Sequence, residues 1–579
     1  MKITNKRLWN HVCKGDLEGI KSLIELGTNK KDRDDIRGTV LLYAVKDSRF
    51  NIVNYLIEQE VNVDAKKDAY GVTALMYAAK NGEPSIVECL IEGGADINVK
   101  DNFGATALMY AIKNGKFRMV KYLIEQGANK EEEDTNGMTA LLCAAKYNES
   151  SIIKYLVEQG ANINAKDNTG DTALMYAAKN REIDIVKYLV EQGIDIEMKN
   201  NAGDTALLHA VKYSKFNIVN YLVKCGADKD VRNNMGDTAL MYAAKNRKTS
   251  IVKYLVKEGA NINVKDNFDA TVLMYAAKYG KFAVGCGKLG VVKYLVEQGV
   301  HINTTNSIGA TALTYAVTYG HLEVVKYLVE QGANINARDN FDAIALMYAA
   351  GCGHLEVVKY LVGQGVNIDA RDIVGMTALM YAVESEHSHP GVEKYLAEKK
   401  VSKEAKNEVV KYLVEQKADI NAKDIVGKTV LMYATKYGDY STINYLVEHG
   451  ADINAKNNSG MTALMYAVEY GHLEVVKYLV EQGVNIDAKD IVGMTALMYA
   501  VECKKLEIEK YLIERRVDKE MELIYSAKYD DIKKHLNETT VGSQDLKKSA
   551  KKRKTAVPQE ELPSACKKNE FLTDIVIIE

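Results

Sequence analysis

Proline, tryptophan and paired cysteines are scarce in this chain, and each shortage excludes a class of architecture. Only 4 of the 579 residues are proline, too few for globular domains joined by proline-rich linkers. The eight cysteines form no Cys-x-x-Cys pair and lie tens of residues apart, which argues against a disulfide framework or a zinc site. We therefore expect reduced thiols and no cofactor.

An excess of one charge and long apolar runs are also missing. Lys and Arg number 76 against 78 Asp and Glu, a net charge of −2, so we expect no direct nucleic-acid binding. No apolar run approaches the length of a membrane span, and none follows the basic residues at the N-terminus. These absences predict no membrane insertion, no secretory signal and a cytoplasmic location.

The hexapeptide Thr-Ala-Leu-Met-Tyr-Ala, with close variants, recurs through most of the chain. Its first position falls at residues 39, 73, 106, 139, 172, 205, 238, 271, 311, 344, 377, 429, 462 and 495, in most cases 33 residues apart. Residues 6–537 hold about 16 units of this length. A fixed period of this size indicates stacked repeats rather than separate globular domains.

Each unit predicts two short helices and a turn, as residues 101–133 illustrate. Asp101 and Gly104 bound the turn, and Thr106 can cap the helix that follows. Gly127 stands at the C′ position of the second helix. Two helices this short cannot bury a core alone, so neighbouring units must share one continuous core. The expected fold class is all-α.

The unit resembles the ankyrin repeat. Residues 137–145, Gly-Met-Thr-Ala-Leu-Leu-Cys-Ala-Ala, match the family's Gly-x-Thr-Pro-Leu-His-x-Ala-Ala helix, and residues 155–161 match its Leu-Leu-x-x-Gly-Ala segment. Most copies carry Thr-Ala-Leu-Met-Tyr-Ala where the family has Thr-Pro-Leu-His-x-Ala. The resemblance implies an ankyrin-repeat solenoid of stacked helix-turn-helix units with hairpin fingers. It also implies a protein-binding surface made by the inner helices and finger tips on the concave face.

Departures from the period predict the domain organisation. Residues 1–38 are expected to form an N-terminal capping repeat and residues 39–383 the regular repeats. Residues 384–428 hold two outer-helix patterns and indicate an irregular half-repeat that lost its inner helix, a candidate hinge. Residues 429–537 carry further repeats and a C-terminal cap, and 538–579 form a basic tail that we expect to be flexible.

The sequence offers no catalytic constellation. His321, His354 and His472 all belong to the same repeated segment, Gly-His-Leu-Glu-Val-Val-Lys-Tyr-Leu, which indicates a structural position at the start of the outer helix. Catalysis needs a singular geometry rather than a repeated one. We therefore expect a protein that is not an enzyme and has no small-molecule substrate. The predicted function is a protein–protein interaction scaffold or adaptor whose partner the sequence does not identify.

Two sets of residues are candidates for contacting that partner. Tyrosines on the inner helices form the first set, although their rings can equally pack between helices: Tyr110, Tyr176, Tyr242, Tyr275, Tyr315 and Tyr348. Apolar residues at the finger tips form the second set, although they can equally fold back on the neighbouring finger: Phe103, Met235, Phe268, Ile308 and Phe341.

The tail suggests an alternative function. Residues 547–554 hold six basic residues in eight, and four of them form a candidate nuclear import signal: Lys551, Lys552, Arg553 and Lys554. A solvated basic tail is the commoner explanation of such a run. The alternative is a nuclear regulator that binds a transcription or chromatin protein and is imported through this tail, which would place the protein in the nucleus.

The resemblance also implies a modification. Ankyrin repeats are substrates of an asparaginyl hydroxylase, and Asn98, Asn421 and Asn454 stand in the sequence context that this enzyme favours. The other interpretation is that each of these side chains hydrogen-bonds the finger backbone.

Two fingers replace the usual turn glycine with aspartate, at Asp269 and Asp342. The turn position requires a positive φ, which glycine adopts freely and aspartate tolerates better than most residues. We expect both residues to have positive φ and to carry strain of roughly 1 kcal/mol relative to glycine.

Overall fold

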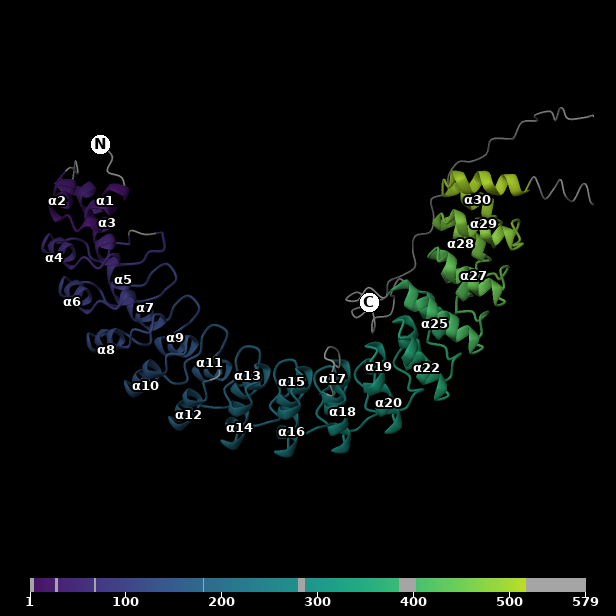
Figure 1. The fold of residues 1–579 in the computed structure, drawn as a ribbon, viewed down its shortest axis with the longest axis horizontal. Coiled ribbons are helices and arrows are strands. Elements are labelled where there is room, and N and C mark those ends of the chain that lie inside the picture. Colours follow the sequence, from purple (N-terminus) through teal and green to yellow (C-terminus); the bar gives the residue numbers. More distant parts are fainter. Residues whose placement is uncertain are drawn as a thin grey trace, which may run out of the picture. The chain divides into compact units, whose positions relative to one another are not determined.

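The computed structural model describes residues 5–25, 30–66, 69–180, 182–279, 287–384 and 402–516 (Figure 1). Contacts divide the chain into two units, Met1–Lys505 and Leu506–Glu579. Of the second unit the structure describes residues 506–516, which are helical. The predicted tail, with its basic segment, lies outside the described residues.

Within the first unit the helices alternate between two rows (Figure 1). From α1 to α28, inner helices pack against an outer helix and against the inner helices of neighbouring repeats, and α30 packs against α28. The inner row consists of α1 (Asn5–Lys14), α3 (Lys30–Lys46), α5 (Ala74–Asn81), α7 (Ala107–Lys113), α9 (Ala140–Tyr147), α11 (Ala173–Lys179), α13 (Ala206–Lys212), α15 (Ala239–Lys245), α17 (Val272–Lys278), α19 (Ala312–Thr318), α21 (Ala345–Gly351), α23 (Ala378–Val383), α26 (Val430–Lys436), α28 (Ala463–Tyr470) and α30 (Ala496–Glu502). The outer row consists of α2 (Leu17–Glu25), α4 (Phe50–Glu58), α6 (Pro84–Glu92), α8 (Phe117–Glu125), α10 (Ser150–Glu158), α12 (Ile183–Glu191), α14 (Phe216–Lys224), α16 (Thr249–Lys257), α18 (Gly287–Glu297), α20 (Leu322–Glu330), α22 (Leu355–Gly363), α25 (Lys403–Glu415), α27 (Tyr440–Glu448) and α29 (Leu473–Glu481).

Local sequence sets the ends of these helices as predicted. Thr106 has extended backbone at the N-cap of α7, and its hydroxyl accepts a hydrogen bond from the Met109 amide over 3.4 Å. Gly127 follows α8 with φ +92°, and the next amide, of Ala128, donates back to the Leu123 carbonyl over 2.9 Å. The interior of α7 is the apolar stretch that the repeat supplies.

The core lies between the two rows and continues from one repeat to the next. Leu108 and Ile112 of α7 are buried against Val120 and Leu123 of α8, all at most 1% exposed. The described residues contain two isolated β-bridges, Lys166–Thr172 and Lys265–Thr271, and no longer strand. The prediction of an all-α solenoid is confirmed. No helix in this described part is both long and apolar enough to cross a bilayer.

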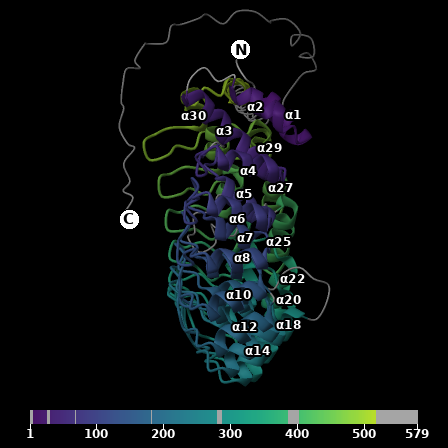
Figure 2. The same ribbon diagram turned by 90° about the vertical axis from the view of Figure 1, so that its left-hand side faces the viewer.

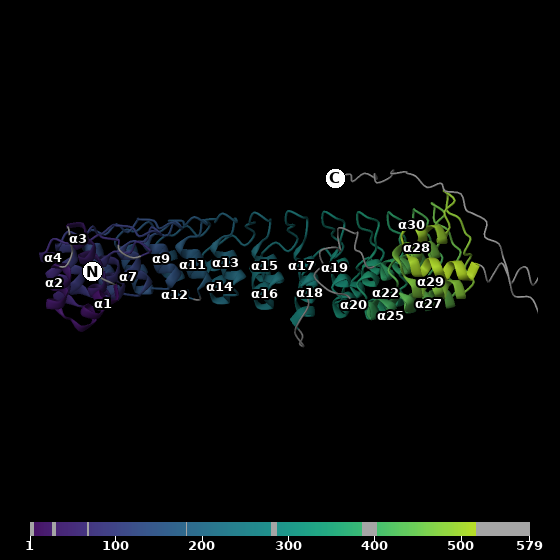
Figure 3. The same ribbon diagram turned by 90° about the horizontal axis from the view of Figure 1, so that it is seen from above.

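The fingers connect each outer helix to the next inner helix and project along one edge of the two rows (Figures 2 and 3). Consecutive fingers are joined by backbone hydrogen bonds, such as that from the Thr135 amide to the Phe103 carbonyl at 2.9 Å. An equivalent hydrogen bond runs from the Ile425 amide to the Val374 carbonyl at 3.0 Å and connects the fingers on either side of the predicted hinge. Residues 385–401 lie outside the described part, so the half-repeat and the hinge stay predictions.

Candidate protein-interaction surface

The base of a finger is closed by one side chain, which in several repeats is an aspartate such as Asp101. Oδ1 of Asp101 accepts hydrogen bonds from the amides of Phe103 and Ala105, both over 2.8 Å. Oδ2 accepts the hydroxyl of Tyr110 on α7, also over 2.8 Å. One side chain therefore shapes the turn and ties it to the inner helix of the same repeat.

The predicted contact tyrosines take part in this arrangement. Their rings are half-buried except that of Tyr348, which is buried. Burial raises the pKa of five of these phenols above the usual value, reinforced by nearby carboxylates, and brings that of Tyr242 to about 12; the five are Tyr176, Tyr242, Tyr275, Tyr315 and Tyr348. The bond to an aspartate nine residues earlier recurs between Tyr176 and Asp167 (2.6 Å), Tyr275 and Asp266, and Tyr348 and Asp339.

In other repeats asparagine replaces the aspartate, and the hydrogen bond runs in the opposite direction. Nδ2 of Asn233 donates to Oη of Tyr242 over 3.1 Å, and Asn306 donates in the same way to Tyr315 over 3.1 Å. Sequence analysis did not find these bonds. The available signal was the constant nine-residue separation between the turn residue and the tyrosine. These contacts give all six hydroxyls a structural partner, and a role in partner binding stays a prediction.

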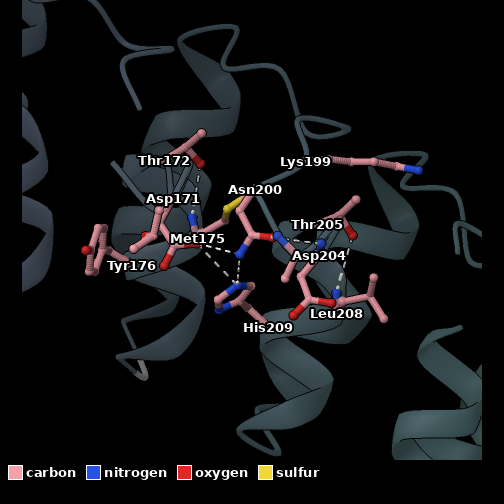
Figure 4. A network of polar contacts seen from close by, with 12 residues as sticks. Asp171, Thr172, Met175, Tyr176, Lys199, Asn200, Asp204, Thr205, Leu208 and His209 are labelled. Atoms are coloured by element: carbon pink, nitrogen blue, oxygen red, sulfur yellow. Dashed lines mark hydrogen bonds and ion pairs between the residues drawn. The ribbon is translucent and has the colours of Figure 1, made fainter. Parts of the chain in front are cut away.

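One repeat places histidine where most of the others have tyrosine (Figure 4). The ring of His209 is buried, with Nε2 3.3 Å from Nδ2 of Asn200 and 3.6 Å from Oδ1 of Asp171. Burial lowers the pKa of His209, although Asp171 and Asp204 act in the opposite direction. The imidazole thus occupies, at the base of its own finger, the place that the phenol takes in neighbouring repeats.

The finger tips differ from the bases because their side chains face solvent. Phe103, Met235 and Phe268 are 55%, 54% and 55% exposed. Ile308 and Phe341 are half-buried. The predicted apolar tips therefore lie on one edge of the array, three of them well exposed.

Tip side chains of consecutive fingers can lie against one another, and apolar tips recur along the edge. The rings of Tyr70 and Phe103, on consecutive fingers, lie with their centroids 6.2 Å apart, so tips can cover one another in part. Other exposed apolar tips occur at Ile373, Val374, Ile425, Val426, Ile491 and Val492. The edge therefore carries apolar groups over many repeats.

Aspartate does occupy a positive-φ position at two tips, as predicted. Asp269 and Asp342 have φ of +58° and +59°. Gly104 takes the same place with φ +76°, and a Cβ there would lie 2.9 Å from the Asp134 Cα and the Thr135 amide nitrogen of the next finger. Glycine thus serves both the turn and the close approach of the next finger.

The repeated histidines are structural, as their recurrence predicted. His321, His354 and His472 are the N-cap residues of their outer helices. Each ring reaches back to the preceding repeat, where Nε2 of His354 lies 3.1 Å from the Thr318 carbonyl and that of His472 lies 3.0 Å from the Lys436 carbonyl. These contacts link successive repeats.

The three candidate hydroxylation residues also link fingers. Oδ1 of Asn98 accepts the Asn129 amide over 2.8 Å, and Oδ1 of Asn421 accepts the Asp452 amide over 2.8 Å. Asn454 makes the same contact with the next finger. Their hydroxylation stays a prediction, and so does the import signal at Lys551–Lys554, which lies outside the described residues.

The described segments hold no group of three or more His, Cys, Asp or Glu side chains arranged to bind a metal ion. The polar groups of the finger bases repeat from unit to unit.

Comparison with known proteins agrees with the geometry. A search of curated proteins found no match. The sequence model described as "Ankyrin repeats (3 copies)" matches at residues 8–101, 78–167, 164–233, 225–284, 267–339, 336–407, 400–490 and 456–523. Ankyrin repeats generally mediate protein–protein interaction, and the family is typically non-catalytic. Because these matches span most of the sequence and coincide with the paired helices and fingers, the chain belongs to the ankyrin-repeat family.

Proposed function

We propose that this protein is a non-catalytic scaffold or adaptor that binds a partner protein along its inner helices and finger tips. The observation that carries the proposal is the edge of apolar tips on fingers whose backbones are hydrogen-bonded to one another. Exposed apolar groups gathered on one edge mark interaction sites in soluble proteins. A rigid support also lowers the entropy that is lost when a partner binds.

The tips suit this role because they are separate from the groups that shape the finger. Phe103 is 55% exposed, whereas Asp101, two residues earlier, is buried and makes the turn's hydrogen bonds. A tip can therefore vary without loss of the fold. Large aromatic side chains are frequent among the residues that dominate binding energy.

Affinity capture with the full-length protein tests the proposal. The tip variant Phe103→Ser/Phe268→Ser is compared with the control variant Phe50→Ser/Phe216→Ser. The control removes two exposed phenylalanines from the outer helices α4 and α14. We expect captured partners to be lost by more than tenfold from the tip variant only, by quantitative mass spectrometry. Equal capture by the wild type and both variants would reject a role for the tips.

A second candidate is a nuclear regulator that binds a transcription or chromatin protein. The sequence Lys551–Lys554 favours it, since such basic runs can act as import signals. In the main proposal the protein is cytoplasmic. A fluorescent fusion with and without residues 547–554 separates the two, because loss of a nuclear signal on deletion supports the regulator. A cytoplasmic signal from both fusions excludes it.

A further inference from the structure

One lysine occupies the last turn of the inner helix in eight successive repeats. We call this set the lysine row: Lys46, Lys80, Lys113, Lys146, Lys179, Lys212, Lys245 and Lys278. The first six are exposed and the last two are partly exposed. The inner helices α5 to α17 contain no acidic residue at all. The net charge of −2 for the whole chain conceals this local excess.

The same position changes character after Lys278. It is occupied by Thr318, Gly351, Glu384, Lys436, Glu469 and Glu502 in the later repeats. A lysine near a helix C-terminus interacts favourably with the helix dipole, and a glutamate unfavourably. Because α28 and α30 form with glutamate in that place, the helices do not depend on the lysine.

Some lysines of the outer row are paired within their own helix, whereas Lys121, Lys154 and Lys253 of that row have no carboxylate within ion-pair distance among the described side chains. Lys187, Lys326 and Lys359 each pair with a carboxylate three residues earlier, at 3.9, 3.0 and 2.9 Å. In the lysine row, Nζ of Lys245 pairs with Asp237 at 2.6 Å. Five members have no carboxylate within ion-pair distance among the described side chains: Lys80, Lys113, Lys146, Lys179 and Lys212. These five positions of the inner row thus present charge that no described carboxylate pairs with.

Several ammonium groups of the row are held in place by an aromatic ring of the next repeat. Nζ of Lys113 lies 5.8 Å from the ring centre of Tyr147, and that of Lys179 lies 5.3 Å from Tyr213. Both of these rings are exposed, at 39% and 37%. Tyrosine is enriched in protein interfaces, so cation and ring together present one recognition surface.

The spacing of the row selects the partner. Packed helices lie about 8–10 Å apart, so successive lysines recur at about that interval. A polypeptide in the polyproline II conformation has three residues per turn and advances about 3.1 Å per residue, so every third side chain lies on the same face and meets the next lysine. Nucleic-acid backbones carry one phosphate per ~3.4 Å of each duplex strand, so the row would meet only about one phosphate in three.

We propose that the lysine row binds an acidic protein segment of roughly 20 residues that adopts an extended, polyproline II conformation and has Asp or Glu at every third position. The proposal rests on the scaffold function above and gives the chemistry of the partner. In this proposal the early repeats recognise the partner through its negative charges.

Fluorescence anisotropy with the full-length protein tests the proposal. The probe is a labelled peptide of about 21 residues with Glu at every third position, and the reference is a peptide of the same composition with its Glu residues clustered. The row variant is Lys113→Gln/Lys146→Gln/Lys179→Gln/Lys212→Gln. We expect it to bind the spaced peptide at least about tenfold more weakly than the wild type does, since four surface ion pairs are lost.

The control variant removes four lysines from outer helices. Lys121→Gln/Lys154→Gln/Lys187→Gln/Lys253→Gln removes the same charge from exposed side chains, three of which also lie over a tyrosine ring of the next repeat. We expect less than about a twofold change in Kd from this variant. Circular dichroism melting of both variants checks that the array is intact.

Three results would overturn the proposal: equal affinity of the row variant and the wild type, equal weakening by the control variant, or tighter binding of a polythymidine oligonucleotide of equal charge. The last result would point to nucleic acid. Failure of the lysine row is distinguishable from failure of the scaffold function. If only the lysine row fails, the wild type still captures a partner that the tip variant loses. If the scaffold function fails, the wild type captures no partner.

Discussion

The base and the tip of one finger differ in almost every physical respect, although they are two residues apart. Asp101 is buried and holds two backbone amides and the hydroxyl of Tyr110. Phe103 is 55% exposed, and it contributes its backbone carbonyl to the next finger. The base makes the fold, whereas the tip side chain adds little to it and is free to serve recognition.

The same contrast explains which substitutions the repeats accept. Bases carry Asp or Asn, since either supplies the oxygen that closes the turn and a group that bonds the inner-helix tyrosine. Tips carry Phe, Tyr, Met, Ile, Val, Thr, Ser, Ala and Asn, because their side chains need only avoid the next backbone. Changes at the base should therefore lower the stability of the fold most, and changes at the tip least.

Alkali should have the largest effect, because it reaches every finger base at once. Burial raises the pKa of Tyr242 and of Tyr466 to about 12, above the value near 10 of an unfolded chain. Stability from these groups is fully present below pH 10 and is lost as pH rises from 10 towards 12. We expect a fraction of the tyrosinate absorbance to appear only together with loss of helical circular dichroism. Complete tyrosine ionisation near pH 10 with intact helices would contradict this.

Removal of one base carboxylate should be the most damaging single substitution. Asp339 is 8% exposed and accepts from the amides of Phe341 and Ala343 and from the Tyr348 hydroxyl. We expect Asp339→Ala to lower the free energy of unfolding by about 3 kcal/mol, because three donors lose their acceptor. The measurement is urea unfolding followed by circular dichroism.

Asparagine at the same position is the matched control. Asp339→Asn keeps an oxygen for the amides and supplies an Nδ2 for the tyrosine oxygen, as Asn306 does for Tyr315. We expect a loss below about 1 kcal/mol. A loss equal to that of the alanine variant would show that the charge, rather than the hydrogen bonds, holds the base.

The turn glycine should show an intermediate effect. We expect Gly104→Ala to cost about 2 kcal/mol, because a Cβ at φ +76° would lie 2.9 Å from the backbone of the next finger. Gly127→Ala, at φ +92° with open space around it, should cost only about 1 kcal/mol. Asp269→Gly should leave stability unchanged or raise it by up to about 1 kcal/mol. Thermal unfolding of the three variants checks this order.

Tip substitutions should have the smallest effect on folding. We expect Phe268→Ser to change the free energy of unfolding by less than about 0.5 kcal/mol, because the ring is 55% exposed. Phe341→Ser should cost more, about 1 kcal/mol, because that ring is half-buried. Each should weaken partner binding by more than about 1 kcal/mol if the tips are contacts. A lowered melting temperature with unchanged binding would assign the rings to finger packing.

The fold could be predicted from the sequence because residues close to each helix end and each turn determine that feature. Thr106 caps the helix that begins beside it, Gly127 ends the helix before it, and Asp269 takes the positive φ that its turn requires. Each feature depends on backbone groups within a few residues. The candidate surface was predicted less completely, since exposure of a tip depends on the finger beside it. Phe268 is exposed and Phe341 half-buried although both stand in the same pentapeptide, Asp-Asn-Phe-Asp-Ala.

The sequence by itself determined the period, the helix pairs, the turn geometry and the family, because all of these follow from short-range patterns repeated many times. Only the tertiary structure decided where side chains find partners across repeats. His354 reaches the carbonyl of Thr318, 36 residues earlier, and the ammonium group of Lys179 lies over the ring of Tyr213, 34 residues later. Such pairings depend on stacking, which places groups about one period apart within a few ångströms of one another.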